Sequence, residues 1–115
     1  MLPQDIKLQM FSTIMDFSED EATLMAQAAT RMVRNMEFDR TANPALNNDA
    51  RFLYDLEGAK LALTIARQRA SDVGKPAAEK ERNMRGLCAM LEIEYYQEMP
   101  SARALSALDD LIRGL

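Results

Sequence analysis

The sequence predicts an all-α protein, a four- to five-helix bundle built on a long antiparallel helical hairpin of about residues 48–73 and 76–99. Gly and Pro are scarce, with four of each, while Ala, Leu and Met are frequent, which favours helix over strand. Apolar residues recur at helical spacing through most of the chain. A Gly-Lys-Pro turn separates the two longest helical segments. Residues 1–115 are expected to form a single domain, because a chain of this length holds one core.

The first two helices are predicted from their starts. Pro3 suits a position where a helix needs no backbone N–H, so a helix is expected over residues 4–15 or 4–17. Ser18 and Glu21 have capping-box spacing and predict that a second helix begins at Ser18. The apolar stripe of this helix is narrow, so it is expected to lie at the periphery of the core. That stripe contains Ala22, Met25, Ala29, Met32 and Met36.

A loop and a long third helix follow. Residues 38–48 contain Pro44 and three Asn without a period, which predicts a loop. We expect Asn47 or Asn48 to cap the third helix, which runs to Val73. Its apolar residues alternate steps of four and three, a spacing typical of close, nearly antiparallel packing on another helix. This seam contains Phe52, Leu56, Ala59, Leu63, Ala66, Ala70 and Val73.

The turn at residues 74–76 sets the expected register of the hairpin. Gly suits the left-handed cap of one helix, and Pro suits the first position of the next. So short a turn makes the two helices antiparallel. In that register Leu63 faces Leu87, and Asp55 comes within hydrogen-bonding reach of Tyr95.

Residues 84–99 carry two roughly opposite apolar faces, so a helix there must be covered twice. The third helix has a second stripe as well, and the fifth helix expected over residues 101–113 is too short to cover both. We therefore expect part of this surface to contact a protein partner or a second copy, with a homodimer as the simplest assembly. The predicted interface consists of Met90, Ile93, Tyr96, Tyr54, Leu61 and Ile65.

The predicted hairpin tip, residues 67–85, is basic although the chain has a net charge of −4. Such a cluster can contact an anion such as nucleic acid or phosphate. The alternative is a solvated turn with helix-surface pairs such as Glu81 with Arg85. The acidic chain and the lack of aromatic residues in this segment argue against general nucleic-acid binding. The six basic residues are Arg67, Arg69, Lys75, Lys80, Arg82 and Arg85.

The residue types that most catalytic sites need are missing from the sequence. There is no histidine, which excludes imidazole metal sites, histidine phosphotransfer and triads with a His base. Cys88 lies on an apolar helical face, which indicates a buried structural thiol instead of a nucleophile. Asp55 and Glu98 form the best carboxylate pair, and a magnesium site needs more oxygen ligands than they offer. We expect no catalytic residue, metal site or cofactor.

These observations predict a non-enzymatic protein-interaction module, such as an adaptor, chaperone or inhibitor, that binds through exposed apolar helical faces. The nine methionines fit this function if they form an adaptable surface, and they fit simple core filling equally well. A nucleic-acid-associated regulator that uses residues 67–85 is the first alternative, and a helical enzyme with carboxylate-bound magnesium is the second. A single cysteine and the lack of a long apolar run predict a cytoplasmic protein that does not span a membrane.

Overall fold

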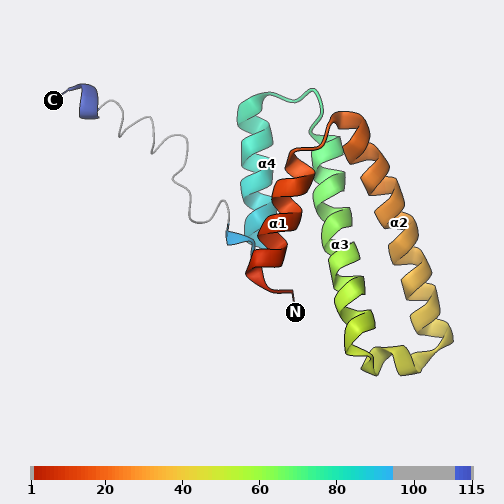
Figure 1. Cartoon of the computed structure of the whole chain (residues 1–115). Coiled ribbons are helices and arrows are strands. Elements are labelled where there is room, and N and C mark those ends of the chain that lie inside the picture. Colours follow the sequence, from red (N-terminus) through yellow and green to blue (C-terminus); the bar gives the residue numbers. More distant parts are fainter. Residues whose placement is uncertain (1, 95–110, 115) are drawn as a thin grey trace.

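The computed structural model describes residues 2–94 and 111–114, and helices account for nearly all of that part of the chain. Successive α-helices run in alternating directions (Figure 1), so the predicted all-α bundle is confirmed. Within the described residues, no helix is long and apolar enough to cross a membrane. The elements are α1 (Gln4–Met15), α2 (Glu19–Ala42), the 3-10 helix η1 (Pro44–Asn48), α3 (Ala50–Ser71) and α4 (Ala77–Met90).

The start of α2 confirms the predicted capping box. The Ser18 hydroxyl accepts a hydrogen bond from the backbone N–H of Glu21 at 3.2 Å, and the Glu21 carboxylate accepts one from the N–H of Ser18 at 3.1 Å. The bonds with the Ser18 backbone and side chain lower the pKa of Glu21, because both favour the ionised carboxylate. Two of the N–H groups that a helix start leaves unpaired are satisfied in this way.

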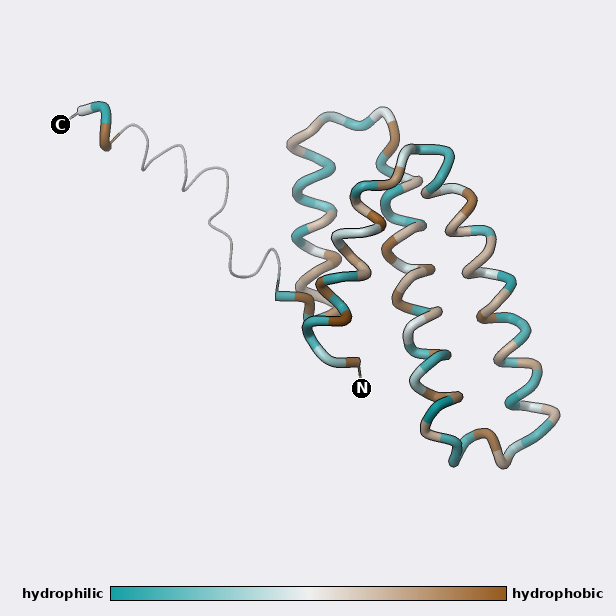
Figure 2. The backbone as a smooth tube through the Cα atoms, viewed as in Figure 1, coloured by the Kyte–Doolittle hydropathy of each residue, from teal (hydrophilic) through white to brown (hydrophobic). Residues whose placement is uncertain are grey.

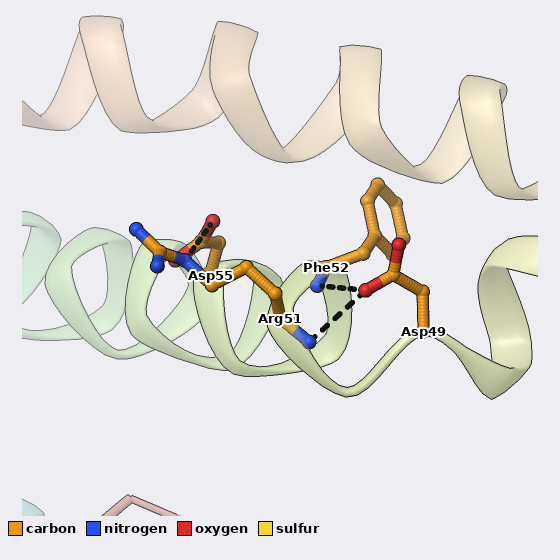
Figure 3. Close-up of polar contacts among 4 residues, drawn as sticks. All are labelled: Asp49, Arg51, Phe52 and Asp55. Carbon is orange, nitrogen blue, oxygen red and sulfur yellow. Dashed lines mark hydrogen bonds and ion pairs between the residues drawn. The ribbon is translucent and has the colours of Figure 1, made fainter.

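The connection between α2 and α3 is shorter and more ordered than the loop predicted over residues 38–48. Helix α2 continues to Ala42, and η1 fills most of the remainder. Asp49 caps α3, in place of the predicted Asn47 or Asn48: its Oδ1 accepts from the N–H groups of Arg51 and Phe52, both at 3.1 Å (Figure 3). A carboxylate at this position also suits the positive end of the helix dipole.

Helices α2 and α3 form the most closely packed pair, an antiparallel hairpin (Figure 1). The sequence predicted instead that the third and fourth helices pack most closely. Ala29 of α2 and Ala59 of α3 are buried, and such small side chains allow two helix backbones to approach. The Phe52 ring also points toward α2 (Figure 3). The regular seam of the third helix was therefore recognised, but it was assigned to the wrong neighbour.

An ion pair joins α2 and α3 beside this seam. Lys60 Nζ lies 2.8 Å from Glu37 Oε1, and Arg40 Nη2 lies 2.6 Å from Glu37 Oε2. The hydrogen bond from Lys60, with the positive charges of Lys60 and Arg40, lowers the pKa of Glu37 below its ordinary value of 4.5. The folded protein therefore favours the ionised form of Glu37 more than the unfolded chain does.

Helix α1 packs against α3 and α4 and lies between them in Figure 1. Phe11 and Ile14 of α1 share one core cluster with residues of α3 and of α4. Helices α3 and α4 themselves make few direct contacts. The second half of α4 is the more apolar half (Figure 2) and supplies its buried residues. The core cluster contains Leu2, Phe11, Ile14, Leu61, Ile65, Ala66, Met84, Leu87, Cys88 and Ile93.

Helix α4 ends at Met90, nine residues before the predicted end at residue 99. The N–H of Ile93 bonds to the carbonyl of Cys88 at 2.8 Å, and the N–H of Glu92 bonds to that of Ala89 at 3.3 Å. Glu92 has a φ of 56°, the left-handed conformation of a Schellman cap, and Ile93 is fully buried. Burial of Ile93 thus compensates for an unfavourable backbone conformation at a residue other than glycine.

Side chains of α1 hold the end of α4. The buried Lys7 donates from Nζ to the carbonyl of Leu91 at 3.1 Å, and Gln4 donates from Nε2 to the carbonyl of Glu92. These carbonyls belong to the end of a helix, where no later N–H can reach them. A cationic donor at this place also suits the negative end of the helix dipole.

The turn between α3 and α4 confirms the predicted left-handed glycine, since Gly74 has a φ of 82°. The expected register is not kept. Leu87 is buried in the core, while Leu63 is half-exposed and lies outside the core cluster. Asp55 pairs with Arg51 at 3.3 Å (Figure 3), and its predicted partner Tyr95 lies outside the described residues.

Of the fifth helix expected over residues 101–113, only 111–113 fall within the described part of the chain, and these three are helical. The remaining positions of that prediction lie outside the described residues, as does the part of the expected fourth helix beyond residue 94. The bundle described here is therefore formed by α1 to α4.

We expect Glu92→Gly to raise the free energy of unfolding by about 0.5–1 kcal/mol, because glycine adopts a positive φ without steric cost. Ala89→Gly is the matched control, since it places glycine inside an exposed part of α4 and should lower stability by about 1 kcal/mol. Urea denaturation of both variants measures the difference. Destabilisation by Glu92→Gly would show that α4 does not end in this cap.

We expect Glu37→Gln to lower the melting temperature at pH 7 and to have less effect as the pH falls below about 4. Since folding lowers the pKa of Glu37, its stabilising contribution is present above the carboxyl value of the unfolded chain and is lost as protons bind at lower pH. Thermal melts from pH 7 to pH 3 test this dependence. In a Lys60→Met background the effect of Glu37→Gln should shrink, and an undiminished effect there would contradict the cross-helix pair.

Candidate binding groove and tip cavity

A largely apolar groove of about 450 Å³ lies between α1 and α2, with α3 as its floor. Each helix contributes a pair of residues that are one turn apart; Asp55 of α3 and Leu2, which precedes α1, complete the lining. We call this feature the methionine groove. The paired residues are Ile6 and Met10 from α1, Met32 and Met36 from α2, and Tyr54 and Gly58 from α3.

The methionine groove is open to solvent. Met32 is 55% exposed and Tyr54 is 40% exposed, which is unusual for large side chains that line an apolar surface. A Cβ atom added to Gly58 would meet nothing within 4 Å, so the floor is hollow at this position. The groove therefore has space at Gly58 for an apolar side chain of another molecule, without displacement of the residues that line it.

Three residues of the predicted partner interface belong to the core of the chain itself. Leu61, Ile65 and Ile93 are buried together with residues of α1. Their stripes were expected to be uncovered, since the main faces of the third and fourth helices were expected to pack on each other. In the structure these three residues pack in the core cluster that also contains Phe11 and Ile14 of α1.

The other three residues of that prediction have different outcomes. Tyr54 lies in the methionine groove, and Met90 is exposed on α4. Tyr96 lies outside the described residues. Tyr54 is the one groove residue that the predicted interface contained, because an isolated helical pattern does not reveal which gap between helices stays unfilled. The high methionine content was the one signal in the sequence that pointed toward such a surface.

Three of the six basic residues at the tip are held by partners within the bundle. Arg69 donates from Nη2 to the carbonyl of Phe17 at 2.9 Å and ties α3 to the turn between α1 and α2. Lys75 lies 3.3 Å from Asp72, and Arg85 lies 3.0 Å from Glu81, as expected for a helix-surface pair. These contacts reduce the charge that the tip presents to a large anion.

The remaining basic residues do not gather on one surface. Arg82 is exposed, and Arg67 lines a shallow hollow beside Met90 on the other side of the α3–α4 pair. Lys80 lines a separate cavity together with Arg69. The structure thus brings together only two of the predicted anion-contact residues as neighbours around one opening.

We call that opening the tip cavity. It has a volume of about 480 Å³ and lies beyond the end of α1, between the last turn of α3 and the first turns of α4. Met15 and Met84 form its apolar part. Its polar part consists of Arg69, Asp72, Lys80 and Glu81.

Asp72 is the most buried charged residue in the described part of the chain, with 1% of its surface exposed. Its Oδ1 accepts hydrogen bonds from Gln68 and Asn83, both at 2.9 Å, and from Lys75 at 3.3 Å. These donors come from α3, α4 and the turn between them, so one oxygen atom joins all three segments. The other oxygen, Oδ2, is buried without a hydrogen-bond partner among the described residues.

The structure places the residues considered for catalysis as follows. Cys88 is buried in the apolar core, as predicted for a structural thiol. Asp55 forms an exposed pair with Arg51, and Glu98 lies outside the described residues. In the described ranges, no three His, Cys, Asp or Glu side chains lie close enough to hold a metal ion.

We expect Asp72→Ala to lower the free energy of unfolding by about 2–4 kcal/mol, because it leaves the donors of Gln68 and Asn83 without their acceptor. Asp72→Asn preserves the shape and one acceptor oxygen and should cost less. Urea denaturation at pH 7 measures both. Equal stability of the Ala variant and the unmodified protein would mean that Asp72 does not join α3 to α4.

Two openings thus distinguish this bundle: an apolar groove formed by three helices and a polar cavity at one end. Their residues come from segments far apart in the sequence, and each opening exists because a neighbouring helix leaves part of α3 uncovered. No protein-family model, no curated protein and no solved structure matches this chain.

Proposed function

We propose that the protein is a non-enzymatic interaction module that holds an apolar helical segment of a protein partner in the methionine groove. The single observation that supports this function is the open groove itself, which is lined by Met10, Met32 and Met36 and has a hollow floor at Gly58. A surface of this kind favours association, because burial of apolar side chains away from water lowers the free energy.

The shape of the methionine groove supports a helical partner segment. Each wall carries residues one turn apart, such as Met32 and Met36, so the groove is somewhat longer than one helical turn. A helix that presents two apolar side chains at i and i+4 matches this length. Asp55 at the edge favours a basic residue beside those side chains, since its present pair with the exposed Arg51 contributes little and can be exchanged.

The methionines support an adaptable contact. Methionine is unbranched and polarisable, so it can fill gaps against differently shaped side chains. Adaptors, chaperones and inhibitors can use such surfaces to bind partners whose side chains differ in shape. A second copy of the chain is an alternative occupant of the same groove, and a homodimer remains part of the proposal.

We expect Gly58→Leu to abolish partner binding while leaving the protein folded. The new side chain fills the hollow floor, and replacing a helix-interior glycine favours the helix by up to about 1 kcal/mol. Gly86→Leu is the matched control, because a Cβ at this α4 position also meets nothing within 4 Å and lies outside the groove. Parallel affinity capture from the native cells, with mass spectrometry, compares the two variants with the unmodified protein.

Partners that are retained by Gly86→Leu and lost by Gly58→Leu identify ligands of the methionine groove. The same set of partners with both variants would contradict the proposed function, as would the lack of any specific partner together with a monomeric mass of the unmodified protein in solution. Light scattering separates the two kinds of occupant: a homodimer predicts that Gly58→Leu halves the mass in solution, whereas a protein partner predicts an unchanged mass. Circular dichroism verifies that both variants remain helical.

A further inference from the structure

We propose that the tip cavity binds a phosphate group that retains a proton, with Arg69 and Lys80 as anion contacts and Asp72 as acceptor of the phosphate O–H. This site is separate from the methionine groove, and it shares no residue with it. The cavity is a consequence of the helix arrangement. Helix α1 ends at Met15, and beyond that point no helix of the described ranges 2–94 and 111–114 fills the space between α3 and α4.

The cationic side of the tip cavity is formed by Arg69 and Lys80. Neither side chain is paired with a carboxylate among the described residues, although both are half-buried. Arg69 uses Nη2 to bond the carbonyl of Phe17, which fixes the guanidinium at the cavity wall and leaves its other N–H groups available. Planar guanidinium and flexible ammonium groups are the usual side-chain ligands of phosphate.

The first turn of α4 adds to this positive side. Ala77, its first residue, lines the cavity, and no side chain caps the helix start at Pro76. The N–H groups of an uncapped first turn carry part of the positive end of the helix dipole. The N–H groups of Glu79 and Lys80 bond to the carbonyl of Pro76, so this contribution is limited to the start of the turn at Ala77, and the carboxylate of Glu79 in the same turn opposes it.

The acidic residues around the tip cavity are already neutralised. Lys75 pairs with Asp72 at 3.3 Å, and Arg85 pairs with Glu81 at 3.0 Å. Arg69 and Lys80 are therefore the charged residues of the lining without an ion-pair partner among the described residues. A phosphate group carries a charge of about −1.5 to −2 at neutral pH and can pair with both.

The acceptor side of the tip cavity is what distinguishes one anion from another. Asp72 lies in the wall, and all three of its donors bond to Oδ1. Its Oδ2 is buried and has no partner in the described part of the chain. A buried acceptor without a donor is costly, so a small movement of the Asp72 side chain that brings this atom to a ligand O–H is favoured by a charge-assisted hydrogen bond.

Phosphate meets both requirements, whereas sulfate meets one. The two anions have the same tetrahedral shape, but phosphate keeps a proton at neutral pH and sulfate has none to donate. Sulfate would place an unprotonated oxygen against the carboxylate of Asp72. We therefore expect phosphate to bind at least about tenfold more tightly than sulfate, the ratio expected of one hydrogen bond to a charged group.

Titration of the full chain with inorganic phosphate and with sulfate at equal ionic strength, followed by ¹⁵N NMR, tests this site. Both anions stabilise proteins non-specifically, so saturable shifts of the Ala77 and Lys80 amides are the readout and the melting temperature is not. Methyl phosphate forms a third arm, and all three anions are titrated at about pH 6, where part of the methyl phosphate still retains a proton. Binding equal to that of inorganic phosphate indicates a phosphate carried on a larger molecule, and weaker binding indicates the free ion.

Lys80→Ala should weaken phosphate binding at least about tenfold, whereas Arg82→Ala, an exposed basic residue outside the cavity, should leave it unchanged. Asp72→Asn presents an amide N–H and should raise sulfate binding to the level of phosphate. Equal binding of sulfate and phosphate by the unmodified protein would overturn the proposal. So would the lack of a saturable shift with either anion, which would mean that water fills the cavity, or an equal loss in Lys80→Ala and Arg82→Ala.

Discussion

The position of α1 between α3 and α4 is the constraint on which the rest of the bundle depends. The side chains of Phe11 and Ile14 lie in the core between α3 and α4, so these two helices do not pack directly on each other along their length. Helix α3 has α2 as its closest neighbour. Helix α4 joins the bundle through the core cluster that it shares with α1 and α3, through the bond from Lys7 to Leu91, and through the bond from Asn83 to Asp72. The buried Lys7 donates to the carbonyl of Leu91, the residue that follows α4, and so fixes the end of α4 against α1.

Local features were predictable from the sequence where local chemistry decides them. The capping box at Ser18 and the left-handed Gly74 depend on residues a few positions apart, and the structure contains both. The end of α4 was not predictable in this way. Glu92 adopts a left-handed conformation that its side chain does not favour, because the burial of Ile93 in a distant core compensates for it. No nearby glycine or asparagine marks that position in the sequence.

The choice between two possible neighbours also lay beyond a one-dimensional pattern. The third helix has two apolar stripes. The sequence indicates that both are buried, but it does not indicate which neighbouring helix packs on each stripe. Ile65 was expected on the outside and lies in the core, whereas Leu63 was expected in the seam and is half-exposed. The candidate sites depend on the same choice, so Tyr54 was the one groove residue that the predicted interface contained.

Helix lengths explain why openings remain at all. Helix α1 has 12 residues and α3 has 22, so α1 spans about 18 Å of a helix that is about 33 Å long. Beyond Met15 the tip cavity is left open, and at the opposite end the hairpin of α2 and α3 extends past α1 (Figure 1). There Phe38 is 73% exposed, and the cap at Asp49 and the ion pairs of Glu37 hold the helices together in place of core packing.

Because local contacts of this kind contribute less to stability than core burial does, the projecting end of the α2–α3 hairpin is the part that can adjust its shape at low energetic cost. The methionine groove lies between this end and the core cluster: its α1 wall belongs to the helix that carries Phe11 and Ile14, and its α2 wall belongs to the helix that continues into the projecting hairpin.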